Sequence, residues 1–100
     1  MLQALPGRAL VPDTTVFVRF EERRVSGSDG CNRFSTGYTL DGGQLEIDPS
    51  GATTLAACPP PIMEQAAAFM KALSVVRTAK LDGTTLSLID ESGTTQATFT

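Results

Sequence analysis

The sequence predicts a mainly β fold of the α+β class. The expected architecture is an antiparallel meander forming a small, partly open barrel-like sheet, with one amphipathic helix at about 61–73. Apolar and polar residues alternate over much of the chain, as they do in half-buried strands. Asp-Gly pairs separate several alternating segments, and such pairs are a strong hairpin signal. Only one segment, past the middle of the chain, follows the helical period instead.

The N-terminal half contains the first predicted strands. Residues 16–20 alternate with Val and Phe on one face, and the charged residues 21–24 are typical of a turn. A second short strand begins at Val25 and breaks into Gly27, Asp29 and Gly30, which are suited to turns or bulges. Residues 35–40 and 44–48 then form a hairpin around the Asp-Gly-Gly sequence between them.

The single helix follows a further strand or extended crossing at 52–57. Pro61 suits the first helical position, where a missing N–H group costs little, while Pro59 and Pro60 keep the approach extended. Apolar residues at helical spacing form one stripe, which we interpret as core: Ile62, Ala66, Phe69, Met70 and Leu73.

Strands resume after the helix, at 75–81, 84–90 and 95–100, with turns at Asp82-Gly83 and Ser92-Gly93. The total is roughly seven or eight short strands, with the helix inserted past the middle. This order is satisfied by a curled meander that carries the helix over an open end or edge.

Composition limits the classes of function. One hundred residues with 41% hydrophobic content are expected to form a single domain, residues 1–100, with one core. A formal charge of -3 and scattered basic residues argue against a nucleic-acid partner. No apolar run approaches the roughly 18 to 20 residues of a transmembrane helix. The first residues also lack the pattern of a secretory signal.

The absence of His from the sequence argues against an enzyme. His is the usual general base near neutral pH, the common partner of a Ser or Cys nucleophile and the commonest metal ligand. No Gly-Lys-Ser/Thr sequence follows the glycines, so a phosphate-binding loop is not indicated. We therefore expect no catalytic residues, no metal and no cofactor.

Cys31 and Cys58 leave two structural interpretations open. A catalytic Cys31 would need its thiol pKa lowered, and only Arg33 is near it in sequence. A structural zinc site usually needs four Cys or His ligands, which this chain cannot supply. The two cysteines are therefore either bonded as a disulfide or neighbouring buried thiols. A disulfide here would add about 3 to 4 kcal/mol in the chain-entropy model.

The stretch VSGSDGCNRF, residues 25–34, is the most unusual in the chain. Asp29 is expected to accept hydrogen bonds from backbone N–H groups of a turn rather than to act as an acid or base. Asn32 tolerates positive φ, and its amide can tie two loop segments together. Arg33 is expected to satisfy loop carbonyls, with anion binding as the alternative.

The order of these segments resembles the META domain family, which includes the HslJ-like heat-shock proteins of bacteria. The likeness is carried by VSGSDGCNRFSTGY, then TTLAAC at 53–58, the amphipathic helix, LSLID at 86–90 and a final Ala-x-Phe. The chain has Leu2 or Leu5 where members often have Trp, and Leu55 and Ala56 where they have a basic residue and Met. The matching signature residues are Gly27, Gly30, Cys31, Asn32, Arg33, Phe34, Thr54 and Cys58.

The resemblance implies a non-enzymatic, stress-related domain of the bacterial cell envelope or secreted fraction, often within lipoproteins. Its expected role is structural or protein-binding, with another protein or an envelope component as partner. Two other hypotheses stay open: thiol redox sensing or exchange through Cys31 and Cys58, and a small-ligand site in the barrel mouth near Arg33 and Tyr38.

Overall fold

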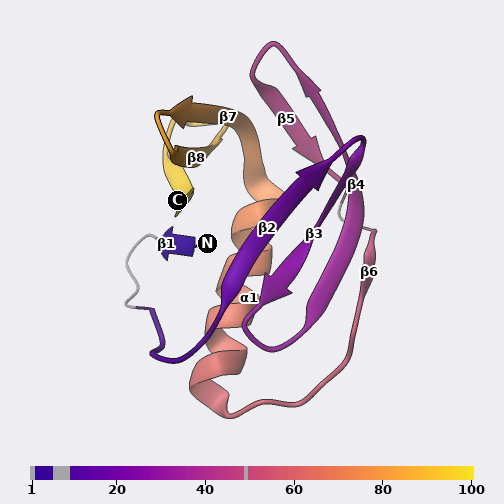
Figure 1. Ribbon diagram of the computed structural model, residues 1–100, viewed down its shortest axis with the longest axis vertical. Helices are drawn as coiled ribbons and strands as arrows, with labels where there is room; N and C mark the ends of the chain where they lie inside the picture. Colours follow the sequence, from indigo (N-terminus) through magenta and orange to yellow (C-terminus); the bar gives the residue numbers. More distant parts are fainter. Residues whose placement is uncertain (1, 6–9, 49) are drawn as a thin grey trace.

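The computed structural model describes residues 2–5, 10–48 and 50–100, and Figure 1 shows their arrangement. In chain order the elements are β1 (Leu2–Ala4), β2 (Val16–Glu21), β3 (Arg24–Asp29), β4 (Arg33–Asp41), β5 (Gln44–Ile47), β6 (Ala52–Thr53), α1 (Pro60–Val75), β7 (Val76–Asp82), β8 (Thr85–Asp90) and β9 (Thr95–Phe99). No helix in this part of the chain has the length and apolar character needed to cross a membrane.

The strands form one open antiparallel sheet, in the order β1-β9-β8-β7-β5-β4-β3-β2, with β6 paired to β4. Two meanders, β2 to β5 and β7 to β9, meet where Gln44 on β5 pairs with Thr78 on β7. β1 returns to pair with β9, and the sheet does not close between β1 and β2. The predicted fold class, a mainly β sheet that is partly open and carries one helix, is confirmed.

The hairpin turns differ slightly from their predicted lengths. Glu21 and Arg24 pair across β2 and β3, so the turn is shorter than the expected 21–24. Arg23 completes it with a φ of 64°. β4 begins at Arg33, two positions before the expected start at residue 35, because Arg33 already pairs with Ser28 on β3. The first half of β4 pairs with β3 and the second half with β5.

The helix is longer than the predicted 61–73, spanning Pro60–Val75. Its first residue is Pro60 rather than Pro61, and only Pro59 keeps an extended conformation, with φ -54° and ψ 148°. No side chain caps this end. Prolines at the first two positions have no N–H groups, so the helix start leaves fewer donors that need a cap.

Residues 52–57, expected to be a further strand or an extended crossing, are a strand only at their start. Only Ala52 and Thr53 pair with β4, opposite Ser35 and Phe34. The following residues run as an irregular segment to the helix, outside any ladder. The closing strand likewise ends at Phe99 rather than at residue 100.

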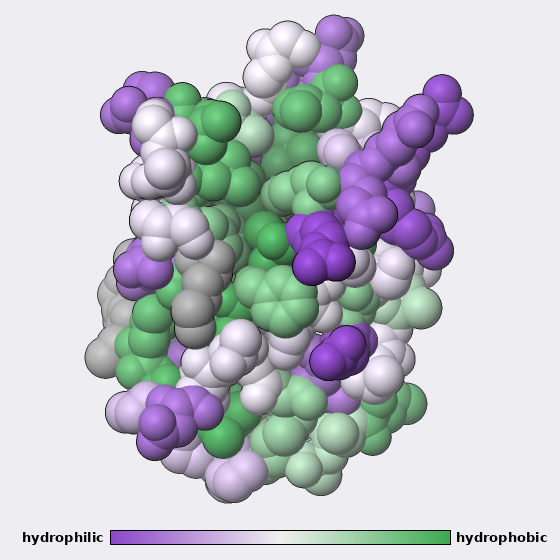
Figure 2. Space-filling model, viewed as in Figure 1, coloured by the Kyte–Doolittle hydropathy of each residue, from purple (hydrophilic) through white to green (hydrophobic). Residues whose placement is uncertain are grey.

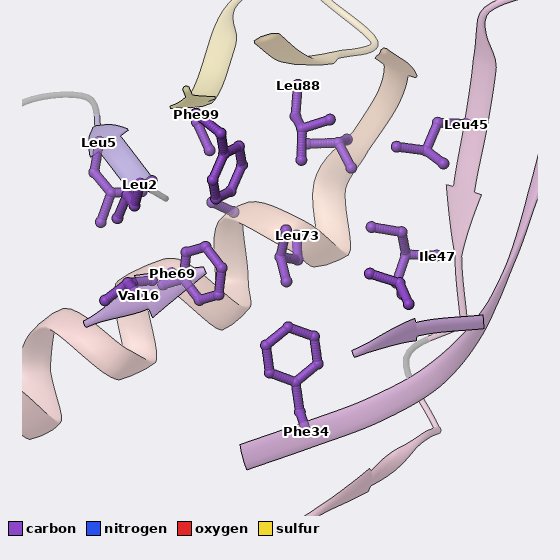
Figure 3. Packing of buried hydrophobic residues seen from close by; sticks show 14 residues of the cluster. Leu2, Leu5, Val16, Phe34, Leu45, Ile47, Phe69, Leu73, Leu88 and Phe99 are labelled. Atoms are coloured by element: carbon purple, nitrogen blue, oxygen red, sulfur yellow. The ribbon is translucent and has the colours of Figure 1, made fainter. Parts of the chain in front are cut away.

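The core lies between α1 and the inner face of the curled sheet, as Figure 3 shows. Phe69 on α1 is fully buried, and its ring lies 6.1 Å from that of Phe34 on β4 and 6.1 Å from that of Phe99 on β9. One helical side chain therefore contacts both meanders. Leu2 and Leu5, expected to replace the family's Trp, are both buried in this core.

Candidate functional site

The turn between β3 and β4 is organised by the carboxylate of Asp29. Its Oδ1 accepts the backbone N–H groups of Cys31, at 2.9 Å, and Asn32, at 2.6 Å. The hydroxyl of Ser28 accepts the N–H of Gly30 at 3.1 Å. Gly30 has a φ of +96°, a left-handed conformation that side chains rarely adopt. Asn32 does not need positive φ, since Gly30 provides that conformation.

Asn32 binds the backbone of the segment that leads to the helix. Its Oδ1 accepts the N–H of Ala56 at 2.6 Å, and its Nδ2 donates to the carbonyl of the same residue at 3.3 Å. The carboxamide thus pairs with both backbone groups of one residue, as a neighbouring strand would. This is the tie between two loop segments that the sequence indicates for Asn32.

Thr54 extends the attachment on the side of β4. Its backbone N–H donates to the carbonyl of Arg33 at 2.9 Å, and its Oγ1 accepts the N–H of Arg33 at 3.0 Å. The same hydroxyl donates to Oδ1 of Asn32 at 2.9 Å. Thr54 and Asn32 therefore attach the segment before the helix to the start of β4 and to the β3–β4 turn.

A disulfide between Cys31 and Cys58 completes this attachment, and no free cysteine is left. Of the two interpretations left open by the sequence, the bonded pair is the one the structure contains. Sγ of Cys31 lies 3.5 Å from Sδ of Met63 and 3.5 Å from the carbonyl oxygen of Ala56. A disulfide sulfur has no proton, so these are packing contacts and not donated hydrogen bonds.

We call residues 54–58 the strap. Residues 54–57 are exposed, and Leu55 is 94% exposed, although Thr54 and Ala56 on either side of it are hydrogen-bonded. The strap is thus an exposed segment with a fixed backbone. It presents the apolar side chain of Leu55 to solvent.

Two glycines allow the close backbone approaches that this region needs. A Cβ on Gly27 would lie 2.0 Å from the carbonyl oxygen of Phe17 on β2. A Cβ on Gly51 would lie 2.2 Å from Cβ of Thr36. Gly27 was expected in a turn, but it lies within β3, where its role is to let β2 approach.

The structure separates Arg33 from Tyr38, the pair expected to form a ligand site. They lie at opposite-facing positions of β4, about 17 Å apart at ordinary strand rise. The Tyr38 hydroxyl donates to the carbonyl of Glu21 at 2.7 Å, and its ring packs edge-on against Phe20 at 5.0 Å. The expected bonds from Arg33 to loop carbonyls are wrong: its guanidinium has no hydrogen bond within the described residues.

An apolar hollow of about 190 Å³ lies elsewhere, between α1 and the sheet. Phe34, Ile47, Met70 and Leu73 line it, and Arg33 and Tyr38 do not. Asp48 is the one ionisable side chain among its described lining residues. Within the described residues, no group of three or more Cys, Asp or Glu is arranged to hold a metal ion.

Gln65 is a polar core residue that the periodicity argument missed. It is fully buried on α1. Its Oε1 accepts the N–H of Val11 at 2.7 Å, and its Nε2 donates to the hydroxyl of Thr14 at 3.0 Å. Gln65 thereby ties the segment before β2 to the helix. A Gln inside an otherwise apolar stripe was the available signal.

Two carboxylates in exposed turns are shifted in pKa. The hydroxyl of Ser92, the amide of Gln96 and the N–H of Thr94 donate to Asp90 and lower its pKa to about 2. The N–H and then the hydroxyl of Ser50 lower the pKa of Asp48. Both shifts favour the ionised form, which makes each group a weaker base.

The fold and this attachment define a class: a small α+β domain with an open antiparallel sheet, in which a disulfide fastens the connection leading to the single helix. The chain belongs to the META domain family, whose model matches residues 1–100. The family predicted from the sequence is therefore confirmed.

Solved structures of similar fold come from two bacteria. The NMR structure of a protein from Burkholderia xenovorans is 23% identical with a TM-score of 0.72, covering 91% of this chain and 69% of that chain. The crystal structure of a DUF4847 family protein from Bacteroides vulgatus is 20% identical with a TM-score of 0.60, covering 82% and 55%. At these identities the likeness shows the fold alone. Among curated proteins, no sequence matches this chain.

Proposed function

We propose that this chain is a non-enzymatic, stress-related protein-binding module of the bacterial cell envelope or secreted fraction. The observation that supports the binding role is the strap. Leu55 is 94% exposed on a backbone held by Asn32 and by the Cys31–Cys58 disulfide. A backbone ordered before association loses less conformational entropy when a partner binds, so more of the contact energy appears as affinity.

Further observations support the compartment and the non-enzymatic role, while the stress-related role rests on the family alone. Disulfides persist mainly in oxidising compartments such as the periplasm or the extracellular space, which favours the envelope or secreted fraction. Asp48 and Asp90, the described carboxyls with shifted pKa, are both lowered, whereas a general base near neutral pH needs a raised carboxyl pKa. The sequence also contains no His.

Site-specific photo-crosslinking tests the binding role. A benzoylphenylalanine at position 55 should give a discrete adduct in bacteria that export the chain to the periplasm. Leu81 on β7, which is 71% exposed, is the matched control position. The adduct should weaken when Cys31→Ser and Cys58→Ser are combined, because the strap then loses one attachment. Equal adducts from positions 55 and 81, or none from either, would contradict the proposal.

Alkylation of the exported protein under non-reducing conditions tests the compartment. The two cysteines should resist alkylation in periplasmic or secreted fractions. Free thiols in the fraction that contains the protein would argue against this localisation.

Thiol exchange is the second candidate, and it is favoured by the partial exposure of both bonded cysteines. Cys58 also lies directly before Pro59, which precedes α1. Equilibration with glutathione buffers measures the reduction potential of the pair. A potential within the range of the glutathione pool would favour redox sensing or exchange, and resistance to that pool would exclude it.

A further inference from the structure

The outer face of the β2–β4 part of the sheet carries cations and hydroxyls in register. Phe17, Ser28 and Arg33 form one cross-strand row, and Arg19, Ser26 and Ser35 form the next. Arg24 follows in the third row, opposite Glu21. We call this surface the basic face, and its members are Phe17, Arg19, Arg24, Ser26, Ser28, Arg33 and Ser35.

These side chains point away from the core. Strand alternation places Val25 and Phe34 on the inner, buried face, and the neighbouring positions on the outer one. In Figure 1 β2 crosses in front of α1, and Figure 2 shows strongly hydrophilic side chains over this part of the front surface. The basic face is therefore open to a partner.

The three arginines of this face are not neutralised within the fold. Arg19, Arg24 and Arg33 are all exposed, and none of their guanidinium groups has a hydrogen bond or ion pair within the described residues. Glu21, opposite Arg24, is the carboxylate at the end of the face. This concentration of positive charge contrasts with the formal charge of -3 for the whole chain.

The spacing of the cations suits an extended ligand. Neighbouring strands lie about 4.8 Å apart and same-face residues about 7 Å apart, so the Cα atoms of Arg19 and Arg33 are separated by about 12 Å. Carboxylates on alternate residues of an extended peptide repeat at about 7 Å. The flexible arginines can therefore reach two or more carboxylates of one segment, each with a bidentate pairing.

We propose that the basic face binds an acidic, carboxylate-rich segment of a partner protein. All three cations are Arg rather than Lys, and Phe17 lies half-buried beside them. Arg and aromatic residues are enriched in protein interfaces, whereas Lys is depleted. The acidic β4–β5 hairpin, with Asp41 and Glu46, lies beside the face and would repel an anion that extends past the face. A short acidic segment therefore fits better than a broad anionic membrane or a nucleic acid.

The basic face continues into the strap. Ala52 pairs beside Ser35, and Thr54 bonds the backbone of Arg33, so the face and Leu55 lie on adjoining parts of the surface. The inference rests on the proposed protein-binding function and adds the chemistry of the partner: an acidic segment beside an apolar contact for Leu55.

Fluorescence anisotropy with the oxidised full chain tests the inference, using a labelled peptide of alternating Glu and Ser as probe. The wild-type chain should bind it, more weakly as salt is added, and should not bind a Lys-Ser peptide. Combining Arg19→Gln with Arg33→Gln should weaken binding about tenfold, since two exposed charge pairs are lost. The matched control combines Lys71→Gln on α1 with Lys80→Gln on β7, which are exposed and remove the same charge.

The outcomes separate cleanly once circular dichroism shows that each variant is folded. A loss confined to the arginine variant supports the basic face, and an equal loss in both variants overturns it. Arginine-dependent binding to anionic phospholipid vesicles without peptide binding would identify a membrane as the occupant instead. Arginine-dependent self-association in sedimentation would identify the chain's own acidic hairpin.

The crosslinking result at position 55 distinguishes this inference from the proposed function. An adduct at position 55 without peptide binding would overturn the basic face and leave the protein-binding module intact. Peptide binding without the adduct would support the basic face and contradict the role of the strap.

Discussion

At the residue scale, Asn32 replaces a missing strand partner. After Thr54, whose N–H bonds the carbonyl of Arg33 on β4, the strap has no ladder partner among the described residues, so its backbone groups need other hydrogen-bond partners. One carboxamide supplies both an acceptor and a donor to Ala56, while its acceptor oxygen also receives the hydroxyl of Thr54. No other side chain except Gln offers this pairing, and Gln is one methylene longer.

Replacing Asn32 should therefore show how much its donated and its accepted hydrogen bonds each add to stability. Asn32→Ala should lower the free energy of unfolding by about 2 kcal/mol, because several partners lose their bonds together. Asn32→Asp should cost about 1 kcal/mol, since it keeps the acceptor for Ala56 and Thr54 but cannot donate. Urea unfolding followed by circular dichroism measures both. Equal stability of Asn32→Ala and the wild type would contradict the role of the carboxamide.

Gly27 gives a second residue-scale prediction. Gly27→Ala should destabilise the fold by about 3 kcal/mol, because its Cβ would meet the carbonyl oxygen of Phe17 at 2.0 Å. Gly37→Ala on β4 is the matched control, where the nearest atom to the added Cβ is the carbonyl oxygen of Arg23 at 3.7 Å. The control should change stability by less than about 1 kcal/mol. Thermal unfolding of both variants decides, and similar losses would refute the close approach as the cause.

Sequence reasoning worked at positions where the partner is local. Asp29 accepts the N–H groups of Cys31 and Asn32, two and three residues further along the chain. An Asp followed by Gly indicates this kind of turn. It failed for Gly27, because the close approach of Phe17 depends on how strongly two strands curl together. It also failed for Arg33, because no local sequence pattern shows whether an arginine side chain finds a hydrogen-bond partner.

At the element scale, the disulfide limits how far the strap can separate from the β3–β4 turn. It joins residues 27 positions apart. Cys31→Ala combined with Cys58→Ala should lower the free energy of unfolding by about 3 to 4 kcal/mol through loop closure. Urea unfolding measures this loss, and reduction of the wild type should reproduce it. Wild-type stability that is unchanged by reduction would show that Asn32 and Thr54 hold the strap without the bond.

The turn between β8 and β9 gives a pH-dependent prediction. The folded pKa of Asp90, about 2, lies below its ordinary value of 3.8. A lowered folded pKa adds stability that is present above the ordinary pKa and is lost as the pH falls from about 4 to about 2. The Tm should therefore fall across this range. Asp90→Asn should flatten the decline, leaving the contribution of Asp48, whose pKa is also lowered. An identical decline in the variant would contradict the assignment.

Element boundaries were harder to predict than element types. The apolar stripe identified the helix, but its start depends on which of three successive prolines first adopts helical ψ. Proline fixes φ alone, so the pattern could not choose between Pro60 and Pro61. Residues 52–57 were compatible with a strand or an extended crossing, and the sequence pattern could not choose between them. Ladder pairing ends at Thr53, and Asn32 bonds the backbone of Ala56 beyond it.

At the scale of the whole molecule, two meanders share one helix. They pair directly where Gln44 faces Thr78, and the N–H of Ala79 donates to the carbonyl of Gly43 at 2.9 Å. They also meet through α1, where Phe69 contacts Phe34 from one meander and Phe99 from the other. We expect sheet and helix to unfold as one cooperative unit, because Phe69 packs against both meanders.

Phe69→Ala should test this cooperativity. The variant should lose about 4 kcal/mol of stability, as expected for a large buried aromatic. Hydrogen exchange should accelerate together in β3 and β8, which belong to different meanders. Met70→Ala, at a half-buried position of the same helix, is the control and should cost less. Acceleration confined to one meander would show that the halves unfold separately.

The sequence predicted the class of fold because alternation and Asp-Gly turns describe each hairpin locally. It could not predict that β5 pairs with β7. Nothing local to Gln44 or Thr78 indicates a partner strand on the other side of the helix in the sequence. The sequence indicated a structural role for the signature residues. That Asn32 holds the strap could be seen only in the structure, where it bonds the backbone of Ala56.

Because β1 pairs with β9, the first and last strands of the fold lie side by side. Leu2 faces Phe99 across that pair, so the backbone enters and leaves at neighbouring points, about 5 Å apart. A domain with this geometry can be spliced into a surface loop of a host protein without forcing the loop ends apart. It can also be circularly permuted, with its ends bridged by a short linker and a new opening cut at Gly83, where an added Cβ would meet nothing within 4 Å.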